Sequence, residues 1–458
     1  MTPTDLIIIG AGPGGYRAAE LAAKSGLKVT IFEAAHLGGT CLNEGCIPTK
    51  ALARNAELLL ALQDGELFGL HDLHYQFDFG QTMARKDTVV ASLRTGIETL
   101  LTHPNISVVN APAHFVDAHT VEAIHDSQSA NHDTQFTAPH IIVATGSEPK
   151  ALRLEAPVAR PVLDSSDLLR LTTLPRSLCI VGAGVIGMEF ASIFSAFGTQ
   201  VTVVEFLKEC LPALDSDIAK RLRKTLEKRG VSFCLQCDVK TIDEQGVTYE
   251  DKKGRRITIE AEQVLMAVGR KPRLSDDFAR AGFDYNERTG IKVDTNMQTT
   301  TPGIYAIGDV NGLAMLAHAA EAQAKRVVSH ILQTAQGVPS HTPSCCIPAA
   351  IFTHPEAACV GPTEDLLKEQ GTAYECRKAF HRANGKAQAM GETEGMLKLF
   401  CEPDAGRILG CHAYGAHSAD LIQEVSVLMD RQTTVAQLRD MVHIHPTLSE
   451  IVLAAAEQ

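Results

Sequence analysis

The chain has 458 residues, which is enough for about three domains. Its 54 acidic residues outnumber 42 lysines and arginines, and the net charge of −12 argues against nucleic acid or an anionic membrane as partner. Twelve cysteines in so long a chain do not indicate a disulfide scaffold. No apolar run is long enough to cross a membrane and the first residues show no cationic leader, so we expect a cytoplasmic protein.

The first predicted element is a buried parallel strand over Leu6–Ile9, which runs into a glycine-rich G-x-G-x-x-G turn. The glycines of this turn are Gly10, Gly12 and Gly15. A helix over 16–24 and a strand over 28–32 are predicted next, and Glu33 ends that strand. An acidic residue at this place accepts a hydrogen bond from a ribose 2′-hydroxyl. The order of these elements predicts a dinucleotide-binding unit.

Two cysteines come closely after this unit. They lie in the stretch Gly38-Gly39-Thr40-Cys41-Leu42-Asn43-Glu44-Gly45-Cys46-Ile47-Pro48-Thr49-Lys50. Five residues of helix rise about 7.5 Å, whereas a disulfide needs its Cα atoms within about 7 Å, so a bonded pair requires a turn, which Gly45 permits. Pro48 fits the first turn of a following helix, where a thiol has a lowered pKa. The pair predicts a redox dithiol, and two buried core cysteines are the alternative.

The next part of the sequence predicts two amphipathic helices between about 52 and 101, with a break near 65–78, and then short strands over 108–140. Eight of the 18 histidines fall between His71 and His140. Their irregular spacing, without a set of cysteines or carboxylates, predicts surface histidines and no metal site. An apolar strand over 141–146 comes next.

The dinucleotide-binding pattern then recurs. A strand over 179–181 leads into a second glycine-rich turn, a helix to about Phe197, a strand over 201–204 and Glu205. The glycines of this turn are Gly182, Gly184 and Gly187. From the first glycine to the acid, both units span 23 positions, which predicts two dinucleotide sites (33 − 10 and 205 − 182).

The two predicted sites differ in the segment that comes after each turn. The first turn runs into the cysteines, and the family resemblance given at the end of this section implies that its nucleotide is the flavin that exchanges electrons with sulfur. The second should therefore hold the nicotinamide. Glu205 would repel a 2′-phosphate and no arginine lies closely after it, so we predict NAD rather than NADP.

Later elements add an apolar strand over 264–270 and another over 303–309, which ends in Asp309. A carboxylate at the end of a strand suits a polyol chain. A helix is expected to begin at Ala317, and its N-terminus favours an anion, which the family resemblance implies to be a reduced flavin. Four further cysteines suggest additional redox pairs, but we interpret them as packing residues, with the first two in a strand. They are Cys234, Cys237, Cys345 and Cys346.

A histidine pattern lies near the C-terminus. His445 precedes Pro446, which is predicted to start a helix, and Glu450 lies about one turn further on. This spacing is typical of a general base with an orienting carboxylate. His443 is the alternative base, and the adjoining proline and the glutamate spacing favour His445.

Two stretches carry a family resemblance. Gly-Gly-Thr-Cys-x4-Cys-Ile-Pro-Thr-Lys and His-Pro-Thr-Leu-Ser-Glu resemble the active-site signatures of the flavin-dependent pyridine nucleotide–disulfide oxidoreductases, and the resemblance covers essentially the whole chain. It implies an α/β fold with two Rossmann-like dinucleotide-binding domains, for FAD and NAD, plus a C-terminal α+β dimerisation domain. The implied segments are 1–148 (FAD), 149–271 (NAD), 272–342 (FAD, second part) and 343–458 (interface).

The resemblance also implies a role for each site residue. Cys41 would form a mixed disulfide with the substrate thiol and Cys46 would pass electrons to FAD, while the partner subunit of a homodimer would supply the base His445, oriented by Glu450. An ion pair of Lys50 with Glu189 would lie near the flavin. The implied FAD contacts are Gly10, Gly12, Gly15, Glu33, Thr40, Lys50, Ala113, Thr145, Gly146, Asp309 and Ala317. The implied NAD contacts are Gly182, Gly184, Gly187, Glu205 and Gly269.

Among family members, this sequence is most similar to those that oxidise protein-bound dihydrolipoamide to lipoamide with NAD+. The reasons are Glu205 with Gly187, the lack of a C-terminal cysteine pair, and the His-Pro-Thr-Leu-Ser-Glu ending. The expected partner is a lipoyl-bearing acyltransferase or a glycine cleavage carrier protein. Two alternatives stay open: a reductase of another disulfide or of metal ions, and a flavoprotein that serves as an assembly subunit. Glu44 places a negative charge in the cysteine loop and is expected to raise the thiol pKa values modestly.

Overall fold

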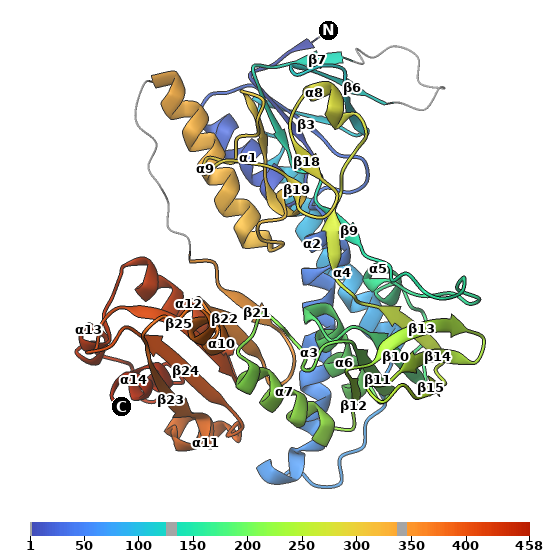
Figure 1. Ribbon diagram of the computed structural model, residues 1–458, viewed down its shortest axis with the longest axis vertical. Coiled ribbons are helices and arrows are strands. Elements are labelled where there is room, and N and C mark those ends of the chain that lie inside the picture. Colours follow the sequence, from blue (N-terminus) through green and yellow to red (C-terminus); the bar gives the residue numbers. More distant parts are fainter. Residues whose placement is uncertain (1, 125–134, 337–345) are drawn as a thin grey trace. The chain divides into compact units, whose positions relative to one another are not determined.

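The computed structural model describes residues 2–124, 135–336 and 346–458 (Figure 1). The chain forms two compact units, each built from three separate segments. Unit 1 consists of Met1–Pro48, Ala84–Lys150 and Arg270–Pro343. Unit 2 consists of Thr49–Met83, Ala151–Gly269 and Ser344–Gln458. The predicted division into four domain segments stays a prediction.

A five-stranded parallel sheet forms the centre of unit 1. Its strands, in order across the sheet, are β20 (Ile304–Ala306), β8 (His140–Val143), β2 (Leu6–Ile9), β3 (Val29–Phe32) and β4 (Ile106–Val109). The sheet therefore joins the chain's beginning to a strand almost 300 positions later. This strand order brings the predicted first and second flavin-binding segments into one sheet.

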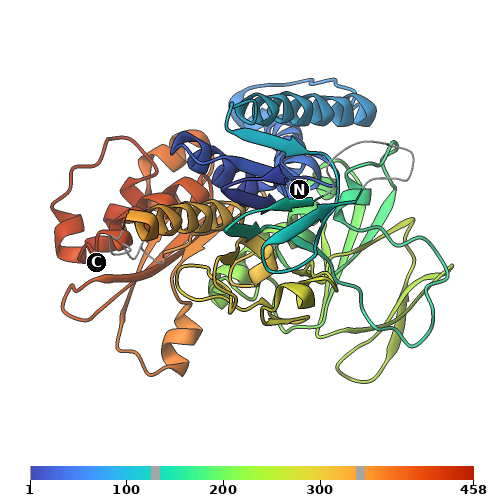
Figure 2. The same cartoon turned by 90° about the horizontal axis from the view of Figure 1, so that it is seen from above.

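Each face of this sheet has its own core, because successive side chains of β2 point to opposite faces. Leu6 and Ile8 pack with the helices α1 (Pro13–Lys24) and α9 (Ala317–Gln336). These two helices lie side by side (Figure 1 and Figure 2). Ile7 and Ile9 pack on the other face, where a second, four-stranded sheet contributes to the core. The strands of that sheet are β1 (Thr2–Pro3), β7 (Gln135–Thr137), β6 (Thr120–Ala123) and β5 (Ala113–Phe115).

Unit 2 contains a second parallel sheet, of four strands. They are β12 (Ser232–Leu235), β11 (Gln200–Glu205), β10 (Ser177–Val181) and β16 (Gln263–Met266). Helix α6 (Val185–Ala196) packs on this sheet and is nearly all apolar and buried. Phe190 and Phe194 of α6 share one core with Leu52 and Leu59 of α3 (Cys46–Gln63). A fully buried helix of this kind is expected when apolar elements cover both its faces.

The C-terminal part of unit 2 is a five-stranded antiparallel sheet with helices on it. The strands are β21 (Ala349–Ile351), β22 (Ala357–Val360), β25 (Ile408–Tyr414), β24 (Met396–Cys401) and β23 (Glu375–Phe380). Helices α12 (Ser418–Asp430) and α14 (Glu450–Ala456) bury their apolar sides against it. This is the predicted α+β layer.

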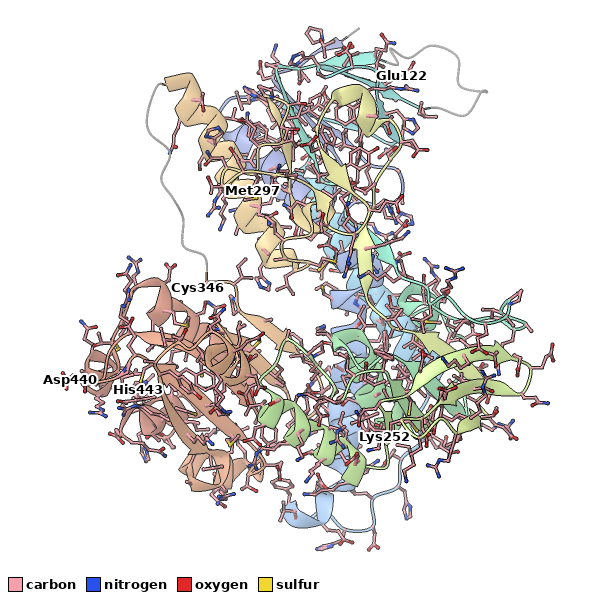
Figure 3. The ribbon with its side chains drawn as sticks, viewed as in Figure 1. Glu122, Lys252, Met297, Cys346, Asp440 and His443 are labelled. Atoms are coloured by element: carbon pink, nitrogen blue, oxygen red, sulfur yellow. The ribbon has the colours of Figure 1, made fainter. Side chains whose placement is uncertain are left out.

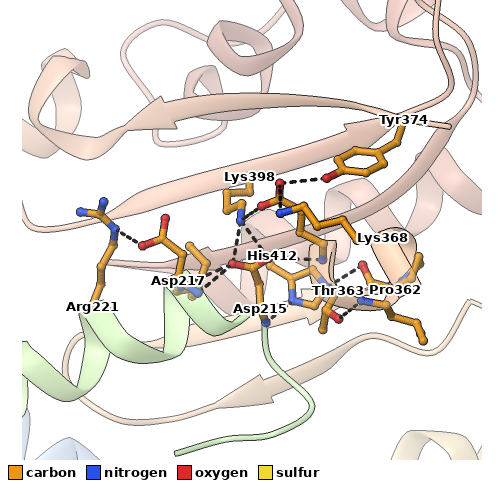
Figure 4. Close-up of polar contacts among 12 residues, drawn as sticks. Asp215, Asp217, Arg221, Pro362, Thr363, Lys368, Tyr374, Lys398 and His412 are labelled. Atoms are coloured by element: carbon orange, nitrogen blue, oxygen red, sulfur yellow. Dashed lines mark hydrogen bonds and ion pairs between the residues drawn. The ribbon is translucent and has the colours of Figure 1, made fainter. Parts of the chain in front are cut away.

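A buried charge cluster connects this sheet to helix α7 (Ser216–Lys228) within unit 2 (Figure 4). Lys398 of β24 donates to both carboxylate oxygens of Asp215, at 2.8 and 2.9 Å, and to Glu364 at 2.5 Å. Asp215 also caps α7, because its carboxylate accepts hydrogen bonds from the first amides of the helix. Its own backbone N–H donates to Nδ1 of His412, and the other ring nitrogen of His412 lies 3.1 Å from the carbonyl oxygen of Pro362.

Most elements predicted from the sequence are confirmed. The strands at Leu6–Ile9 and 179–181 are present, and the break between the two long helices is present between α3 and α4 (Phe79–Leu100). The helix predicted to begin at Ala317 does begin there. In the described part of the chain, no helix is long and apolar enough to cross a bilayer.

Apart from the strands predicted over 141–146 and 264–270, which end early at Val143 and Met266, four expectations about local structure were wrong in detail. The helix predicted from residue 16 begins at Pro13, because a proline fits the first helical turn. The strand predicted over 303–309 ends at Ala306, since the chain turns into a short 3₁₀ helix at Gly308, where φ is +73°. Cys237 lies outside the strand that holds Cys234, because Gln236, with φ of +57°, breaks the strand between them.

The fourth correction concerns Pro446, which does not start a helix. Helix α14 begins at Glu450 instead. The carboxylate of Glu450 accepts from the backbone N–H of Thr447 at 2.8 Å, and the Thr447 hydroxyl donates to the carbonyl of Ile444. These contacts stabilise a non-helical turn before the helix. Cys345 lies outside the described residues, so its predicted packing role stays a prediction.

Candidate functional site

The first glycine-rich turn, in unit 1, brings strand β2 directly into helix α1. Gly10 has φ of +105°, a conformation that favours glycine, and a Cβ there would lie 2.3 Å from the Ala144 carbonyl oxygen. A Cβ at Gly15 would lie 1.9 Å from the carbonyl oxygen of Gly10, so only glycine allows the helix to start this close to the turn. Gly12 precedes the first residue of α1, whose leading N–H groups are the ordinary site for a phosphate.

The second turn, in unit 2, repeats this geometry residue by residue. Gly182 also has φ of +105°, and a Cβ there would lie 2.5 Å from the Ala267 carbonyl oxygen. A Cβ at Gly187 would lie 2.0 Å from the carbonyl of Gly182, while one at Gly184 would meet no atom within 4 Å. The space in front of α6 is therefore open where a backbone-bound pyrophosphate needs it.

The acid at the end of each unit has the same two backbone contacts. Glu33 accepts from the backbone N–H of Ala11 at 2.8 Å and from that of Ala35 at 2.9 Å. Glu205 accepts from the N–H of Ala183 at 2.6 Å and from that of Leu207 at 2.7 Å. Each carboxylate oxygen keeps a second lone pair, which can accept a hydrogen bond from a ribose hydroxyl. The two turns and acids fit the FAD and NAD that the sequence predicts.

The cysteine loop, residues 41–46, is not a continuous helix. Cys41 lies in the short helix α2 (Gly39–Glu44), and Cys46 is the first residue of α3. Gly45 separates the two helices, with φ of −142° and ψ of −111°, so the predicted interruption between the cysteines is confirmed. Cys41 is half-buried and Cys46 is exposed. The position of Cys46 at a helix N-terminus is the one predicted to favour a thiolate.

A side chain close to Cys41 reinforces the polar character of this region. Tyr16 of α1 donates to Glu321 of α9 across 3.4 Å. Burial, followed by the charges of Glu321 and Cys41, raises the pKa of Tyr16 to about 12. Tyr16 therefore stays a neutral donor beside the cysteine loop.

Unit 2 contains the predicted pair of Lys50 and Glu189. Lys50 Nζ lies 2.9 Å from each carboxylate oxygen of Glu189, which is 4% exposed. The backbone N–H of Phe352 donates to the same carboxylate at 2.9 Å, and its ring lies 4.7 Å below the Lys50 ammonium. These contacts compensate the charge of the buried Glu189 carboxylate, while the Lys50 side chain stays 31% exposed. The predicted ion pair is thus present.

Asp309 of unit 1 is the second residue of the short 3₁₀ helix after β20, and its carboxylate accepts from the Ser147 hydroxyl at 2.5 Å. Arg270 donates to the same serine through Nε at 2.7 Å and to its carbonyl oxygen at 2.8 Å. Burial raises the pKa of Asp309, while the hydrogen bond from Ser147 and the charge of Arg270 lower it. Ser147 and Arg270 therefore orient a carboxylate that can accept from a polyol.

The remaining predicted contacts are spread over several elements. Thr145 and Gly146 come after the carboxyl end of β8, the edge at which a parallel sheet binds its ligands, and the Thr145 hydroxyl donates to the carbonyl of Arg273. Thr40 is exposed beside Cys41. Ala113 lies in β5 of the small sheet, paired with Ala123. In unit 2, Gly269 has φ of +103° after β16.

The C-terminal part of unit 2 contains His443, which is labelled in Figure 3, and His445, and the two side chains have different surroundings. His445 Nδ1 lies 2.9 Å from Glu450, and the histidine side chain is 78% exposed. His443 is 8% exposed and both its ring nitrogens have partners, Glu424 at 3.1 Å and the carbonyl of Met441 at 3.2 Å. The backbone N–H of Thr447 and then His445 lower the pKa of Glu450. His445 is therefore the histidine whose outer nitrogen faces solvent and can meet a substrate.

Sequence reasoning did not find several residues of the site. Asn43 lay inside the recognised cysteine motif but received no role, and its partner Arg94 is on α4. Ser147 and Arg270 were also missed, although each comes directly after a glycine in a predicted contact segment. Their position beside those glycines is the one signal that the sequence contains. In the described residues, no group of histidine, cysteine and carboxylate side chains could hold a metal ion.

Comparison with known proteins agrees with this architecture. The sequence profile described as pyridine nucleotide-disulphide oxidoreductase matches residues 4–324, and that of the dimerisation domain of the same family matches 347–456. The chain belongs to the pyridine nucleotide-disulphide oxidoreductase family. It is therefore an NAD-dependent flavoprotein disulfide oxidoreductase with FAD and NAD as cofactors, and its dimerisation domain supports a homodimer.

Full-length relatives are known in sequence and in structure. The chain is 35% identical to a dihydrolipoyl dehydrogenase of Chlamydia muridarum, over 98% of this chain and 95% of the relative. It is 36% identical to that of Geobacillus stearothermophilus, with coverage of 99% and 96%. Among solved structures, the HOCl-induced flavoprotein disulfide reductase RclA of Escherichia coli, in a Cu(II) complex, matches with a TM-score of 0.87 at 30% identity, covering 100% of this chain and 99% of that one. LpdA from Mycobacterium tuberculosis matches with a TM-score of 0.89 at 27% identity, with coverage of 100% and 99%.

Proposed function

We propose that the protein oxidises dihydrolipoyl groups carried by another protein and reduces NAD+ to NADH. The observation that carries this proposal is full-length similarity, at 35% and 36% identity, to dihydrolipoyl dehydrogenases of two distant bacteria. The cysteine loop and the His445–Glu450 pair supply the side chains that such a reaction requires. The partner is proposed to be a lipoyl-bearing acyltransferase or a glycine cleavage carrier protein, and the compartment the cytoplasm.

The first step is thiol–disulfide exchange. His445, from the partner subunit of the homodimer, takes the proton of one dihydrolipoyl thiol, while Glu450 orients the imidazole. The resulting thiolate attacks the Cys41 sulfur of a Cys41–Cys46 disulfide, the bond between the cysteines breaks, and Cys46 leaves as a thiolate. The second lipoyl thiol then displaces Cys41 from the mixed disulfide. The products are lipoamide and a cysteine dithiol.

The other residues hold cofactors and charges. Bound FAD supplies the acceptor for the two electrons of the dithiol and the hydride for NAD+. The N-terminus of α1, Glu33 and Asp309 are proposed to hold FAD, and the Lys50–Glu189 ion pair is proposed to lie near it. The N-terminus of α6 and Glu205 are proposed to hold NAD, because the Glu205 carboxylate accepts a ribose hydroxyl and repels a 2′-phosphate.

The test is the rate of NAD reduction by dihydrolipoamide, with purified, FAD-loaded protein. Rapid turnover with NAD and none with NADP is the expected result, and Cys46→Ser should abolish the disulfide-linked rate. A Cys46→Ser protein with full turnover would contradict the mechanism. If NADH reduces the Cys41–Cys46 disulfide to the dithiol but dihydrolipoamide gives no turnover, the substrate is another disulfide or a metal ion such as Cu(II), which the likeness to RclA would then favour.

A further inference from the structure

Asn43 lies between the two cysteines and its side chain is fully used in hydrogen bonds within unit 1. Its Nδ2 donates to the carbonyl oxygen of Leu37 at 3.0 Å and to that of Gly39 at 2.9 Å. Its Oδ1 accepts from Nε of Arg94 at 3.0 Å and from Nη2 of Arg94 at 2.6 Å. An amide side chain has two donor hydrogens and two acceptor lone pairs, so all its capacity is engaged.

The two carbonyls that Asn43 holds flank a glycine turn. Gly38 and Gly39 have φ of +96° and +59°, a conformation that other residues rarely adopt. A Cβ at Gly39 would lie 2.7 Å from Cα of Gly12, and the Gly38 N–H donates to the carbonyl of Ala11 at 2.9 Å. The Gly38–Gly39 turn is therefore in contact with the first glycine-rich turn. Asn43 connects this turn to helix α2, which carries Cys41.

Arg94 connects the same loop to helix α4. Two nitrogens of its planar guanidinium donate to one oxygen of Asn43. This geometry depends on the fixed spacing of the guanidinium nitrogens. Arg94 is half-buried and lies 51 positions after Asn43, on a helix that otherwise contributes no predicted site residue. The cysteine loop is thus held by the first glycine-rich turn on one side and by α4 on the other.

We propose that Asn43 and Arg94 are positioning residues, which hold the Cys41–Cys46 loop in the geometry in which the two sulfurs form and break their disulfide. The proposal rests on the proposed function in that Cys41 and Cys46 form the redox pair. A disulfide forms within a narrow range of Cα distances, and a prearranged loop loses less conformational entropy when it closes. Loosening the loop should therefore disfavour the disulfide relative to the dithiol.

The test is the disulfide equilibrium of the FAD-loaded protein in dithiothreitol redox buffers. One molecule of reduced dithiothreitol converts the protein disulfide to two thiols and becomes its own cyclic disulfide, so electrons and protons balance. Acid quenching, alkylation and mass spectrometry then report the thiol fraction of Cys41 and Cys46. This readout requires neither lipoamide nor NAD.

Asn43→Leu and Arg94→Met should each shift the equilibrium about 10-fold toward the dithiol, which corresponds to about 30 mV for this two-electron couple. Arg94→Lys keeps the positive charge but not the planar pair of donor nitrogens. It should therefore reverse less than half of the shift that Arg94→Met causes. The double variant should be no worse than either single variant, because the two side chains act as one unit. The flavin absorbance and the thermal midpoint of each variant show whether it is folded.

The matched controls are Asn105→Leu and Arg54→Met. Asn105 is a partly buried asparagine of unit 1 that donates to the Ala23 carbonyl, and Arg54 forms an exposed pair with Glu57. Both controls should keep the wild-type equilibrium. If Asn43→Leu does not fold, Arg94→Met and Arg94→Lys decide the question.

Wild-type equilibria in folded Arg94→Met would overturn the positioning role, as would full restoration by Arg94→Lys, because charge alone would then suffice. A wild-type protein that forms no Cys41–Cys46 disulfide even in fully oxidised dithiothreitol would instead overturn the proposed redox pair. The two failures are therefore distinguishable in one experiment.

Discussion

Lys398 and Asp215 form a bidentate ion pair, with Nζ 2.8 and 2.9 Å from the two carboxylate oxygens and with both residues 1% exposed. Glu364 is the second acidic partner, and it also accepts from Tyr374 and Lys368 (Figure 4). Because Asp215 caps α7 and Lys398 belongs to the C-terminal sheet, the pair links two layers of unit 2. None of these residues belongs to the proposed reaction.

Replacing Lys398 should therefore destabilise unit 2 without changing the chemistry. Lys398→Met leaves the carboxylate of Asp215 buried and uncompensated, which costs about 3–5 kcal/mol of unfolding free energy. Denaturant unfolding at fixed protein concentration measures this loss. The control is Lys368→Met, because Lys368 forms an exposed pair with Glu364 and should matter little. Equal losses of unfolding free energy in the two variants would contradict the argument that the buried ion pair matters more than the exposed one.

The His412 ring in the same cluster predicts a pH dependence. Burial lowers the pKa of His412 from 6.5 to about 4, against the charge of Asp215, which raises it. Its Nδ1 accepts from the Asp215 N–H, so the folded protein requires the neutral ring. As the pH falls below 6.5, the unfolded chain binds the proton first, and folding stability declines until the pH reaches about 4.

The expected contribution of His412 over this range is on the order of 3 kcal/mol. His412→Gln should flatten the decline of unfolding free energy between these two pH values, measured by urea titrations at several pH values. The exposed His114 provides the control, since His114→Gln should leave the wild-type slope. An unchanged slope in His412→Gln would assign the acid sensitivity to other groups.

Glu205 combines a specificity role with a structural one. Glu205→Gln should remove the negative charge that repels a 2′-phosphate and raise the NADP-to-NAD ratio of kcat/KM about 10-fold or more, while one carbonyl oxygen still accepts a backbone N–H. Glu205→Ala should instead lose stability, because the N–H groups of Ala183 and Leu207 lose their acceptors. Steady-state kinetics with both nucleotides and thermal unfolding separate the effects. A Glu205→Gln protein that still rejects NADP would contradict the charge argument.

The two C-terminal histidines should respond differently to substitution. His445→Gln should lower kcat with dihydrolipoamide by about 10² to 10⁴, because the thiol loses its base. His443→Gln should change turnover only a few-fold and lower stability, since His443 is held by Glu424 and Met441. Reduction of a quinone by NADH, which needs no thiol base, should be kept in both variants. A larger kcat loss in His443→Gln would reverse the assignment.

Local sequence patterns were sufficient to predict much of the fold. Both dinucleotide units were predicted with strand ends within one or two residues, because a glycine-rich turn, a helix of fixed length and a short apolar strand are each encoded by neighbouring residues. The interruption at Gly45 could be predicted for the same reason, because it too depends on neighbouring residues. Local patterns failed at Pro446 and Cys237, where side-chain contacts and a left-handed residue determine the ends of the elements.

The sequence by itself determined that this chain has two dinucleotide turns, a cysteine pair and a histidine–glutamate pair, since each is a short pattern whose chemistry depends on adjacent residues. Tertiary structure decided which side chains meet across long separations. Asn43 meets Arg94 over 51 positions and Lys398 meets Asp215 over 183, and no periodicity in the chain predicts either contact. Such pairs form only after folding closes the intervening loops, because the hydrogen bonds that select them exist only in the packed state.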